Sequence, residues 1–392
     1  MSVVDNLLDE LCPDGVEYKP IGSFADVRSG ATPKKSNAEY WENGTIPWMS
    51  SGEVHKKIIT GVEKKITQAG FDSCSTKMIA PDAVVIALAG QGKTRGTVAL
   101  TKIELCTNQS LCAITCNDTV RPAYLYHFLT SQYQQLREVS SGDGTRGGLN
   151  LKMVKRYVVP VPPIEIQDEI VRILDSFAEL EAELEAELEA RKAQYAYYRD
   201  TLLNFERGGV LVEWLPMSKV LAMKAGEGIA SGLISGEQTD VRPFACYGGN
   251  GIRGYVMTAN QKDDAVLVGR QGALCGNVRF AKGPFYATEH AIVVKPCVDL
   301  DKRFLFHALT VAELAQYKTS GAQPGLSVAR LGRAEIPVPP LEVQERIVSI
   351  LDRFDALTTS LTDGLPAEIE ARRKQYEYYR DKLLDFPHKE SA

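Results

Sequence analysis

An internal repeat constrains this chain more than any other feature of its sequence. The segment Val159-Pro-Val-Pro-Pro-Ile-Glu-Ile-Gln-Asp-Glu-Ile-Val-Arg-Ile-Leu-Asp-Ser-Phe177 recurs 177 residues later as Ile336-Pro-Val-Pro-Pro-Leu-Glu-Val-Gln-Glu-Arg-Ile-Val-Ser-Ile-Leu-Asp-Arg-Phe354. A second segment, Ala190 to Phe205, recurs 181 residues later as Ala371 to Phe386. Each half of the chain is therefore predicted to be a divergent globular domain followed by a well-matched helical segment.

The repeat predicts the domain organisation. The chain has 392 residues, more than one hydrophobic core usually absorbs, so at least two domains are expected. The predicted segments are an N-terminal helical segment (1–15), a first globular domain (16–158), a first long helix (159–205), a second globular domain (206–335) and a second long helix (336–388).

The matched segments are predicted to be long helices with a coiled-coil seam. Their apolar residues recur mostly in alternating steps of four and three, the spacing of such a seam. Each apolar stripe needs a partner, and the other copy is the nearest candidate, antiparallel across a pseudo-twofold axis. The alternative for either stripe alone is an ordinary amphipathic bundle helix. The predicted seam residues are Ile170, Phe177, Leu184 and Tyr195 in the first helix, and Ile347, Phe354, Leu361 and Tyr376 in the second.

The second helix has gained four residues, and Gly364 and Pro366 lie in this insertion. A kink or short break is expected there, because proline removes a helical hydrogen bond. The globular domains contain β-branched runs, glycine turns and a few helices, predicted at Ala123–Arg137 and Arg303–Tyr317. The predicted fold class is α+β, with two globular domains separated by two long antiparallel coiled-coil helices.

Composition limits the class of protein. No apolar run approaches the ~20 residues of a membrane-spanning helix, and residues 1–12 lack the pattern of an export signal. We therefore expect a cytoplasmic protein with no membrane partner. The net charge is −5, but residues 165–189 contain ten acidic residues and one basic residue, so the rest of the chain carries +4. This distribution indicates an acidic helix attached to a mildly basic body.

The eight cysteines form no CxxC pair, which favours reduced thiols. Cys106, Cys112 and Cys116 could in principle bind a metal, but their spacing matches no common zinc pattern. We expect buried structural thiols and no metal site.

No catalytic set is recognisable in the sequence. Gly92-Lys93-Thr94 resembles part of a phosphate-binding loop, but Ala87 stands where that loop needs glycine, and a strand rather than a helix is predicted next. The five histidines form no HExxH, and His127 and His307 occupy matching helix positions as expected of scaffold residues. The Pro-Pro pairs also lack the flanking residues of an adenine-methylating motif. We therefore predict a non-catalytic chain.

Matched loops with different polar residues are the candidate DNA readers. Residues 90–96 correspond to 270–276, and 107–109 to 288–290. Arg, Lys, Asn, Gln and related side chains read base edges in the major groove, and lysines contact phosphates. For any one lysine, a solvated surface charge is an equal alternative. The candidates are Lys34, Lys35, Trp41, Lys56, Lys57, Gln91, Lys93, Arg95, Asn108 and Gln109 in the first domain, and Arg242, Tyr247, Asn250, Arg253, Arg270, Gln271 and His290 in the second. Lys64, Lys65 and Trp48 could add phosphate contacts.

The whole chain resembles the specificity subunit of type I restriction-modification systems. The resemblance is carried by the two Pro-Val-Pro-Pro-[Ile/Leu]-Glu-x-Gln segments, the two Gln-Tyr-x-Tyr-Tyr-Arg-Asp segments, and the opening Leu7-Leu-Asp-Glu-Leu-Cys-Pro-Asp-Gly-Val-Glu-Tyr18. It implies two target-recognition domains that each read half of a bipartite site on double-stranded DNA, and two helices that set the unread spacer.

The resemblance also implies the partners. Two methyltransferase subunits would bind S-adenosylmethionine, and restriction subunits, which translocate DNA, would use ATP and Mg²⁺; this chain would hold no cofactor. Two other classes are weighed against it. An enzyme acting on DNA by itself is disfavoured by the missing motifs. A structural coiled-coil protein would leave two divergent domains on matched helices unexplained.

Overall fold

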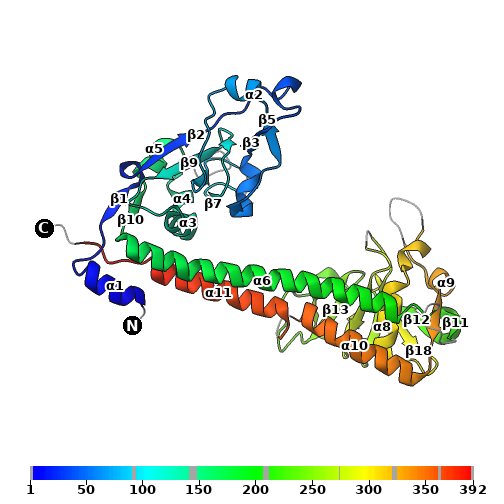
Figure 1. The fold of residues 1–392 in the computed structure, drawn as a ribbon. Coiled ribbons are helices and arrows are strands. Elements are labelled where there is room, and N and C mark those ends of the chain that lie inside the picture. The colour runs from blue at the N-terminus through cyan, green and yellow to red at the C-terminus, as the bar shows by residue number, and fades with distance from the viewer. Residues whose placement is uncertain are drawn as a thin grey trace. The chain divides into compact units, whose positions relative to one another are not determined.

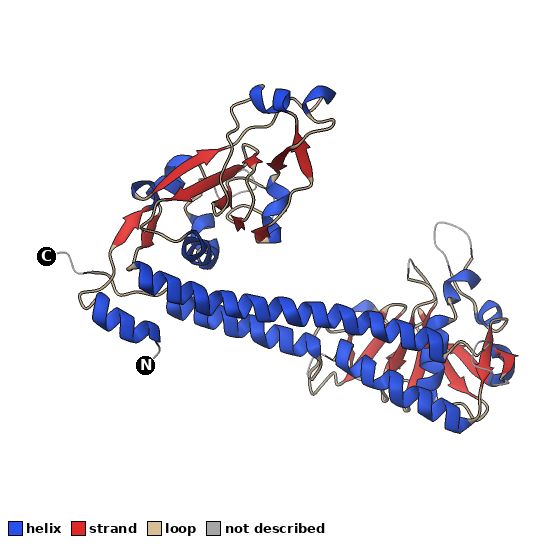
Figure 2. Ribbon diagram, in the orientation of Figure 1, coloured by secondary structure: helices blue, strands red, loops and turns tan. Residues whose placement is uncertain are grey.

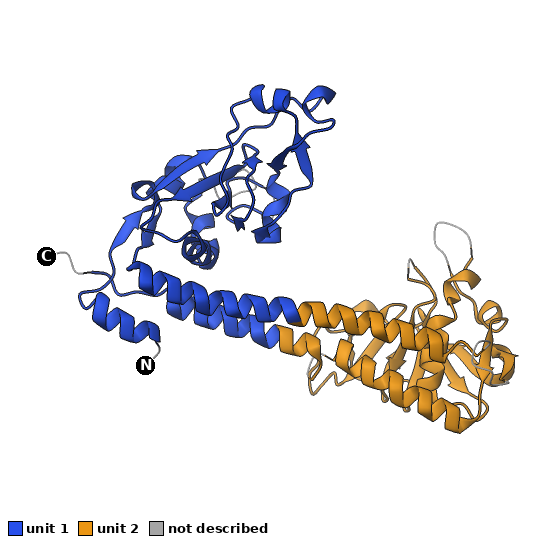
Figure 3. Ribbon diagram, in the orientation of Figure 1, with its two compact units in different colours: residues 1–183, 370–392 blue, residues 184–369 orange. Residues whose placement is uncertain are grey.

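The computed structural model divides the chain into two compact units (Figure 3). It describes residues 3–90, 94–140, 148–205, 212–272, 274–319, 325–360 and 363–389. Unit 1 comprises residues 1–183 and 370–392, and unit 2 comprises residues 184–369. The divisions fall within two helices, α6 (Ile164–Leu202) and α11 (Leu365–Leu383). Each unit therefore combines one globular domain with helical segments from both halves of the sequence.

Unit 1 contains a five-stranded sheet in the order β2-β9-β6-β7-β4 and a three-stranded sheet in the order β5-β3-β8. The β-branched run Val84-Val85-Ile86 forms most of β6, which is buried along its whole length. A further pair, β1 with β10, runs antiparallel. The strands are β1 Tyr18–Pro20, β2 Ala25–Ser29, β3 Ile46–Met49, β4 Ile58–Ile59, β5 Lys64–Ile66, β6 Val84–Ala87, β7 Val98–Thr101, β8 Cys106–Thr107, β9 Leu111–Cys116 and β10 Val158–Pro160.

Unit 2 repeats this topology. Its sheets have the orders β12-β18-β15-β16 and β14-β13-β17, and β11 pairs with β19. These orders match those of unit 1 strand for strand, except that unit 1 adds β4. Figure 2 shows the mixture of helices and strands in each unit, which agrees with the predicted α+β class. The strands are β11 Glu213–Pro216, β12 Leu221–Ala225, β13 Phe244–Gly248, β14 Gly251–Val256, β15 Ala265–Gly269, β16 Val278–Ala281, β17 Tyr286–Ala287, β18 Ala291–Pro296 and β19 Glu335–Val338.

The helices within the domains are shorter than predicted. The helix expected over Ala123–Arg137 divides at Gln132, whose ψ of 16° interrupts the helical backbone. The helix expected over Arg303–Tyr317 ends early because Glu313 adopts a left-handed conformation, with φ 44°. The shorter helices are α1 Val3–Leu11, α2 Gln68–Asp72, α3 Pro122–Ser131, α4 Tyr133–Glu138, α5 Leu151–Arg156, α7 Met217–Val220, α8 Lys302–Val311 and α9 Val328–Leu331.

The first long helix is continuous and the second is interrupted. Helix α6 has 39 residues. In the second copy, α10 (Leu341–Thr359) ends before Gly364, and α11 begins directly after this glycine, at Leu365. The break expected near Gly364 and Pro366 is therefore confirmed. Proline is tolerated at the second position of α11, because the first turn of a helix leaves its N–H groups without helical partners.

In unit 1, α6 and α11 lie side by side and antiparallel (Figure 1). Phe177 of α6 stacks on Tyr379 of α11 with ring centroids 5.4 Å apart. Four residues further along α6, the Glu181 carboxylate accepts a hydrogen bond of 2.7 Å from Arg373 Nε. As the contacts move toward the C-terminus of α6, their partners move toward the N-terminus of α11, as in an antiparallel pair.

In unit 2, α6 packs against α10. Phe354 of α10 lies between Tyr195 and Tyr198 of α6, with ring centroids 6.4 and 5.5 Å away. Leu184 is buried at 9% exposure. Ile170 and Ile347, which were predicted in the seam, belong to the hydrophobic cores of units 1 and 2. Leu361 lies outside the described residues.

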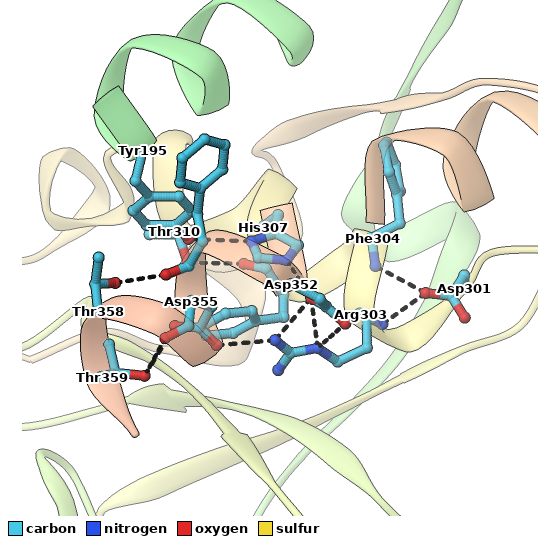
Figure 4. A network of polar contacts seen from close by, with 12 residues as sticks. Tyr195, Asp301, Arg303, Phe304, His307, Thr310, Asp352, Asp355, Thr358 and Thr359 are labelled. Carbon is cyan, nitrogen blue, oxygen red and sulfur yellow. Dashed lines mark hydrogen bonds and ion pairs between the residues drawn. The ribbon is translucent and has the colours of Figure 1, made fainter. Parts of the chain in front are cut away.

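A buried histidine links helices in unit 2 (Figure 4). His307 on α8 is fully buried, and its Nε2 lies 2.8 Å from Asp352 Oδ1 on α10. Its Nδ1 lies 3.3 Å from the Tyr195 hydroxyl on α6. Burial lowers the pKa of His307, and this effect outweighs the opposing influence of Asp352. Arg303 completes the network with hydrogen bonds to Asp352 and Asp355.

Unit 1 contains the equivalent network. His127 on α3 is 2% exposed, with Nε2 2.8 Å from Asp175 Oδ1 on α6 and Nδ1 3.1 Å from the Tyr376 hydroxyl on α11. The prediction that His127 and His307 are scaffold residues is confirmed. The two segments of the sequence repeat meet at each histidine, because the aspartate comes from one half of the chain and the tyrosine from the other.

A buried glutamine attaches the start of a long helix to its domain in both units. In unit 2, Gln344 is fully buried; its Oε1 accepts from Asp301 N at 2.7 Å. Its Nε2 donates to Asp299 O at 3.1 Å and to Pro339 O at 2.8 Å. In unit 1, Gln167 makes the matching bonds to Arg121 N, Thr119 O and Pro162 O. This geometry explains the glutamine of the Pro-Pro-x-Glu-x-Gln segment.

We predict that Gln344→Ala destabilises unit 2 by about 2–4 kcal/mol, because it leaves one backbone N–H and two carbonyls without their buried partner. Gln194→Ala on α6 is the matched control, since that side chain accepts a single bond from Arg191 near the surface. Urea unfolding, with hydrogen exchange to assign the loss to α8 and α10, measures the effect. Equal effects of the two substitutions would contradict the anchoring role.

Candidate nucleic-acid interface

Predicted residues from four separate segments line one groove in unit 1. The groove has a volume of about 840 Å³. We call it the unit 1 groove. Its lining includes three exposed basic side chains, those of Lys35, Lys64 and Lys65. The remaining lining residues used below are Thr32, Trp41, Trp48, Ser50, Ser51, Asn108 and Gln109.

The two tryptophans form the rigid wall of the unit 1 groove. Trp48 on β3 is 3% exposed, and its Nε1 donates to Ala31 O at 3.0 Å. Trp41 packs edge-on against Trp48 with ring centroids 5.1 Å apart. Its own Nε1 donates to Lys34 O at 3.3 Å, which ties the exposed lysine segment to the aromatic pair.

A close backbone approach places the polar residues predicted to contact DNA, Asn108 and Gln109, in the same groove. A Cβ atom on Gly30 would lie 1.8 Å from Thr107 O, so only glycine allows this approach. The approach brings Thr32 to the β8–β9 turn, where its hydroxyl lies 2.5 Å from Gln109 Oε1. In the same turn, Asn108 Oδ1 accepts from Ser110 N at 3.0 Å.

The other unit 1 candidates lie outside the unit 1 groove. Lys56 pairs with the buried Glu53 at 3.1 Å and with Glu63 at 3.4 Å. Burial alone would raise the pKa of Glu53, but backbone N–H groups and the Lys56 ammonium outweigh burial and lower it. Lys57 is exposed at the end of a 3₁₀ turn. Arg95 is buried, and its Nε has no partner among the described residues. Gln91 and Lys93 lie outside the described part of the chain.

Three loops of unit 2 lie against one another, and we call them the unit 2 loop cluster. They are the β13–β14 turn with Asn250, the β15–β16 loop with Arg270 and Gln271, and the β17–β18 loop with His290. Arg270 N donates to His290 O at 2.8 Å. A Cβ atom on Gly249 would lie 3.1 Å from His290 O and 3.2 Å from Gln271 O, so the turn packs against both other loops.

Side chains also connect these loops. His290 Nδ1 lies 2.8 Å from Gln271 Oε1, and His290 Nε2 lies 3.3 Å from Glu289 Oε1. Asn250 Oδ1 accepts from Asn277 Nδ2 at 2.9 Å. The cluster is therefore a hydrogen-bonded surface on short loops between buried strands.

The remaining unit 2 candidates differ in exposure. Tyr247 packs edge-on against Phe285 at 5.5 Å, and burial raises the pKa of its hydroxyl. Arg253 is exposed on β14. Arg242 is half-buried, and its Nε has no hydrogen-bond partner among the residues the structure covers.

Sequence reasoning missed Thr32, Ser50, Glu289 and Asn277 as members of these two surfaces. Glu289 could have been found, because it lies in the repeat-matched segment 288–290 and corresponds to Asn108. Thr32 carries no such signal, since its place in the unit 1 groove depends on the close approach at Gly30.

The cysteines differ in exposure: Cys106, Cys112, Cys246 and Cys275 are buried, whereas Cys297 is exposed. Burial raises the pKa of Cys106 to about 11 and those of Cys112 and Cys116 to about 12. Within the described residues, no group of three or more His, Cys, Asp or Glu side chains is arranged to hold a metal ion. No described helix is both long and apolar enough to cross a membrane.

Comparison with known proteins identifies relatives along most of the sequence. A family model described as the type I restriction modification DNA specificity domain matches residues 13–190 and 243–371. The EcoprrI type I restriction enzyme specificity subunit of Escherichia coli is 35% identical over 382 residues, with 93% of this chain and 92% of that protein covered. The EcoR124I/EcoR124II specificity subunit of the same organism is 30% identical, with 100% and 99% covered.

A solved structure shares the fold. The S subunit of a type I restriction-modification system from M. genitalium superposes with a TM-score of 0.59 at 17% identity, covering 94% of this chain and 95% of that one.

Proposed function

This chain belongs to the family of type I restriction-modification specificity subunits, and on that premise we propose that each of its two units reads one half of a bipartite DNA site. A specificity subunit recognises the DNA target of its restriction-modification complex. In the proposed division of labour, the unit 1 groove reads one half-site and the unit 2 loop cluster reads the other.

One observation carries this proposal. The two units have matching strand orders, yet the loops at matching positions present different polar side chains. Asn108 and Gln109 in unit 1 correspond to Glu289 and His290 in unit 2. A common scaffold with different hydrogen-bonding groups is what two independent base readers need, because bases are distinguished by donor and acceptor patterns.

Charge favours the domains over the long helix as the DNA-binding surfaces. Residues 165–189 of α6 carry a net charge of −9, which repels phosphates. In the unit 1 groove, by contrast, three lysines, Lys35, Lys64 and Lys65, outnumber the one lining carboxylate, Glu63, and lie beside two tryptophans and two amides. We assign the phosphate contacts to these lysines and to Lys34, and the base contacts to the amides.

The long helices are proposed to form an antiparallel coiled coil across a pseudo-twofold axis and to dock two methyltransferase subunits. Support comes from the duplicated Gln-Tyr-x-Tyr-Tyr-Arg-Asp segment. In each copy the third tyrosine stacks on a phenylalanine of the opposite helix, as Tyr198 does on Phe354 and Tyr379 does on Phe177. The preceding tyrosines, Tyr197 and Tyr378, are 67% and 63% exposed. Aromatic rings held on a rigid base are frequent anchors of protein interfaces.

Chemistry is proposed to reside in the partners. The methyltransferase subunits would bind S-adenosylmethionine, and the restriction subunits would bind ATP and Mg²⁺ and translocate and cleave DNA. This chain would supply the specificity for the DNA target and no catalytic group. The complex would act in the cytoplasm, where the DNA is.

Exchange of one domain tests the proposed function. Replacing residues 16–158 with the first domain of another family member should change one half of the methylated motif, because each unit reads its half independently. Sequencing of methylated adenines in cells that carry the complete complex measures this. The isolated chain, incubated with S-adenosylmethionine and DNA, is the control and should transfer no methyl group. Changes in both half-sites, or in neither, would refute the assignment.

Lysine substitutions test the assignment of phosphate contacts. Lys34→Ala and Lys35→Ala should each weaken binding to every duplex and lower the slope of log affinity against log salt by about 0.9, the value for one phosphate contact. Lys102→Ala is the matched control, because Lys102 already pairs with Asp82 at 2.7 Å. If either variant changed the recognised motif, or had the same salt slope as Lys102→Ala, the assignment of Lys34 and Lys35 to phosphate contacts would be wrong.

A further inference from the structure

We propose that His290 is a positioning residue for Gln271, and that together they make unit 2 select guanine at one position of its half-site. The inference rests on the proposed function of unit 2 as a reader of one half-site. It specifies the base whose major-groove edge the unit 2 loop cluster recognises. It also names the side chain that orients Gln271 for this recognition.

The orientation of the Gln271 amide carries the argument. A glutamine reads adenine with both ends of its amide: Oε1 accepts from N6 while Nε2 donates to N7. In unit 2 the Oε1 end is already engaged, because it lies 2.8 Å from His290 Nδ1. Because this contact turns Oε1 toward His290, the free end of the exposed Gln271 amide is its Nε2 group, which only donates.

His290 can hold this orientation because its own position is fixed twice. Its carbonyl accepts from Arg270 N at 2.8 Å, and its Nε2 lies 3.3 Å from Glu289 Oε1. With a proton on each ring nitrogen, the imidazolium donates from Nδ1 to Gln271 Oε1 and from Nε2 to the Glu289 carboxylate, and these two bonds fix the rotation of the ring. The packing of Gly249 against both loops adds a backbone constraint.

A pair of neighbouring side chains that presents only donors, here the Gln271 Nε2 group and Arg270, selects guanine. The adjacent Arg270 also has donors and no acceptor. In the major groove, guanine presents two adjacent acceptors, N7 and O6, whereas adenine places a donor at N6 beside its single acceptor. The Nε2 group of Gln271 therefore meets two acceptors on guanine and a repelling N–H on adenine.

In unit 1 the amide of Gln109 is oriented in the same way, by a threonine hydroxyl in place of a histidine. Gln109 Oε1 lies 2.5 Å from the Thr32 hydroxyl, which engages the accepting end of that amide. The repetition in an independent domain favours amide orientation as a general means of selecting the base.

Methylated-motif sequencing of His290 variants in the complete complex tests the inference. The wild-type motif should contain guanine at one position of the half-site assigned to unit 2. In His290→Ala the amide is released and can rotate, so adenine should be accepted there as well as guanine. The preference for guanine should fall from about 5- to 150-fold, the range for one bidentate contact, to about threefold or less. The other half-site should not change.

The matched control is His290→Asn. Its side-chain N–H₂ approximates the place of Nδ1, so it should keep the bond to Gln271 Oε1 and keep the guanine preference. Gln271→Ala should lose discrimination at the same position. If a variant supports no methylation in cells, competition between guanine and adenine duplexes for the purified complex measures the same ratio.

The inference is overturned if His290→Ala retains the full guanine preference, if His290→Asn relaxes like alanine, or if the unit 2 half-site contains no guanine. Those results would leave the proposed function intact. A wild-type complex that methylates no bipartite motif would instead refute the proposed function itself.

Discussion

The buried glutamine at the start of each long helix is the contact on which the rest of the structure depends. Gln344 and Gln167 each make hydrogen bonds to three backbone groups, one N–H and two carbonyls. Among the described residues, no other side chain hydrogen-bonds to these groups. One of those groups, Asp301 N, belongs to the residue that caps α8. The direction of the helix, the start of α8 and the end of the preceding strand are thereby fixed by a single side chain.

The histidine networks extend this anchoring along the helices. His307 meets Asp352 from its own half of the chain and Tyr195 from the other half, and His127 does the same with Asp175 and Tyr376. Burying a polar side chain is costly unless it is hydrogen-bonded, so each site specifies one arrangement of three helices. The reader loops can then diverge, because the contacts that hold the scaffold lie elsewhere.

Much of this scaffold could be predicted from the sequence. The repeat gave the pairing of divergent domains with matched helices, and Gly364 with Pro366 indicated the break between α10 and α11. Other features could not be predicted, because they depend on three-dimensional approach. One example is that Ile170 and Ile347, which have seam spacing, also belong to the hydrophobic cores of units 1 and 2. Arg95 has the chemistry of a base reader but is buried.

Among the candidate readers, the sequence indicated which loops correspond between the two halves but not which loops lie together in space. Residues 270–271 and 288–290 are adjacent in unit 2. The bond from His290 to Gln271 was not predicted, because it depends on side-chain orientation. The pairing of Lys56 with Glu53 likewise needs a carboxylate that the fold has buried.

We propose that the two units read their half-sites independently and that the long helices set the distance between the half-sites. Helix α6 has 39 residues, or about 58 Å at ~1.5 Å per residue. At ~3.4 Å per base pair this length corresponds to roughly 17 base pairs, an upper bound, since the domains can dock inward of the helix ends.

The most direct measurement is the methylated motif of a chain with four residues inserted after Leu188 and four after Ile369. Four residues add ~6 Å and turn the seam by only ~40°, so the helices should still pair. The account predicts two unchanged half-sites with a spacer longer by one or two base pairs, at about 3.4 Å each. An unchanged spacer in a fully active complex would contradict it.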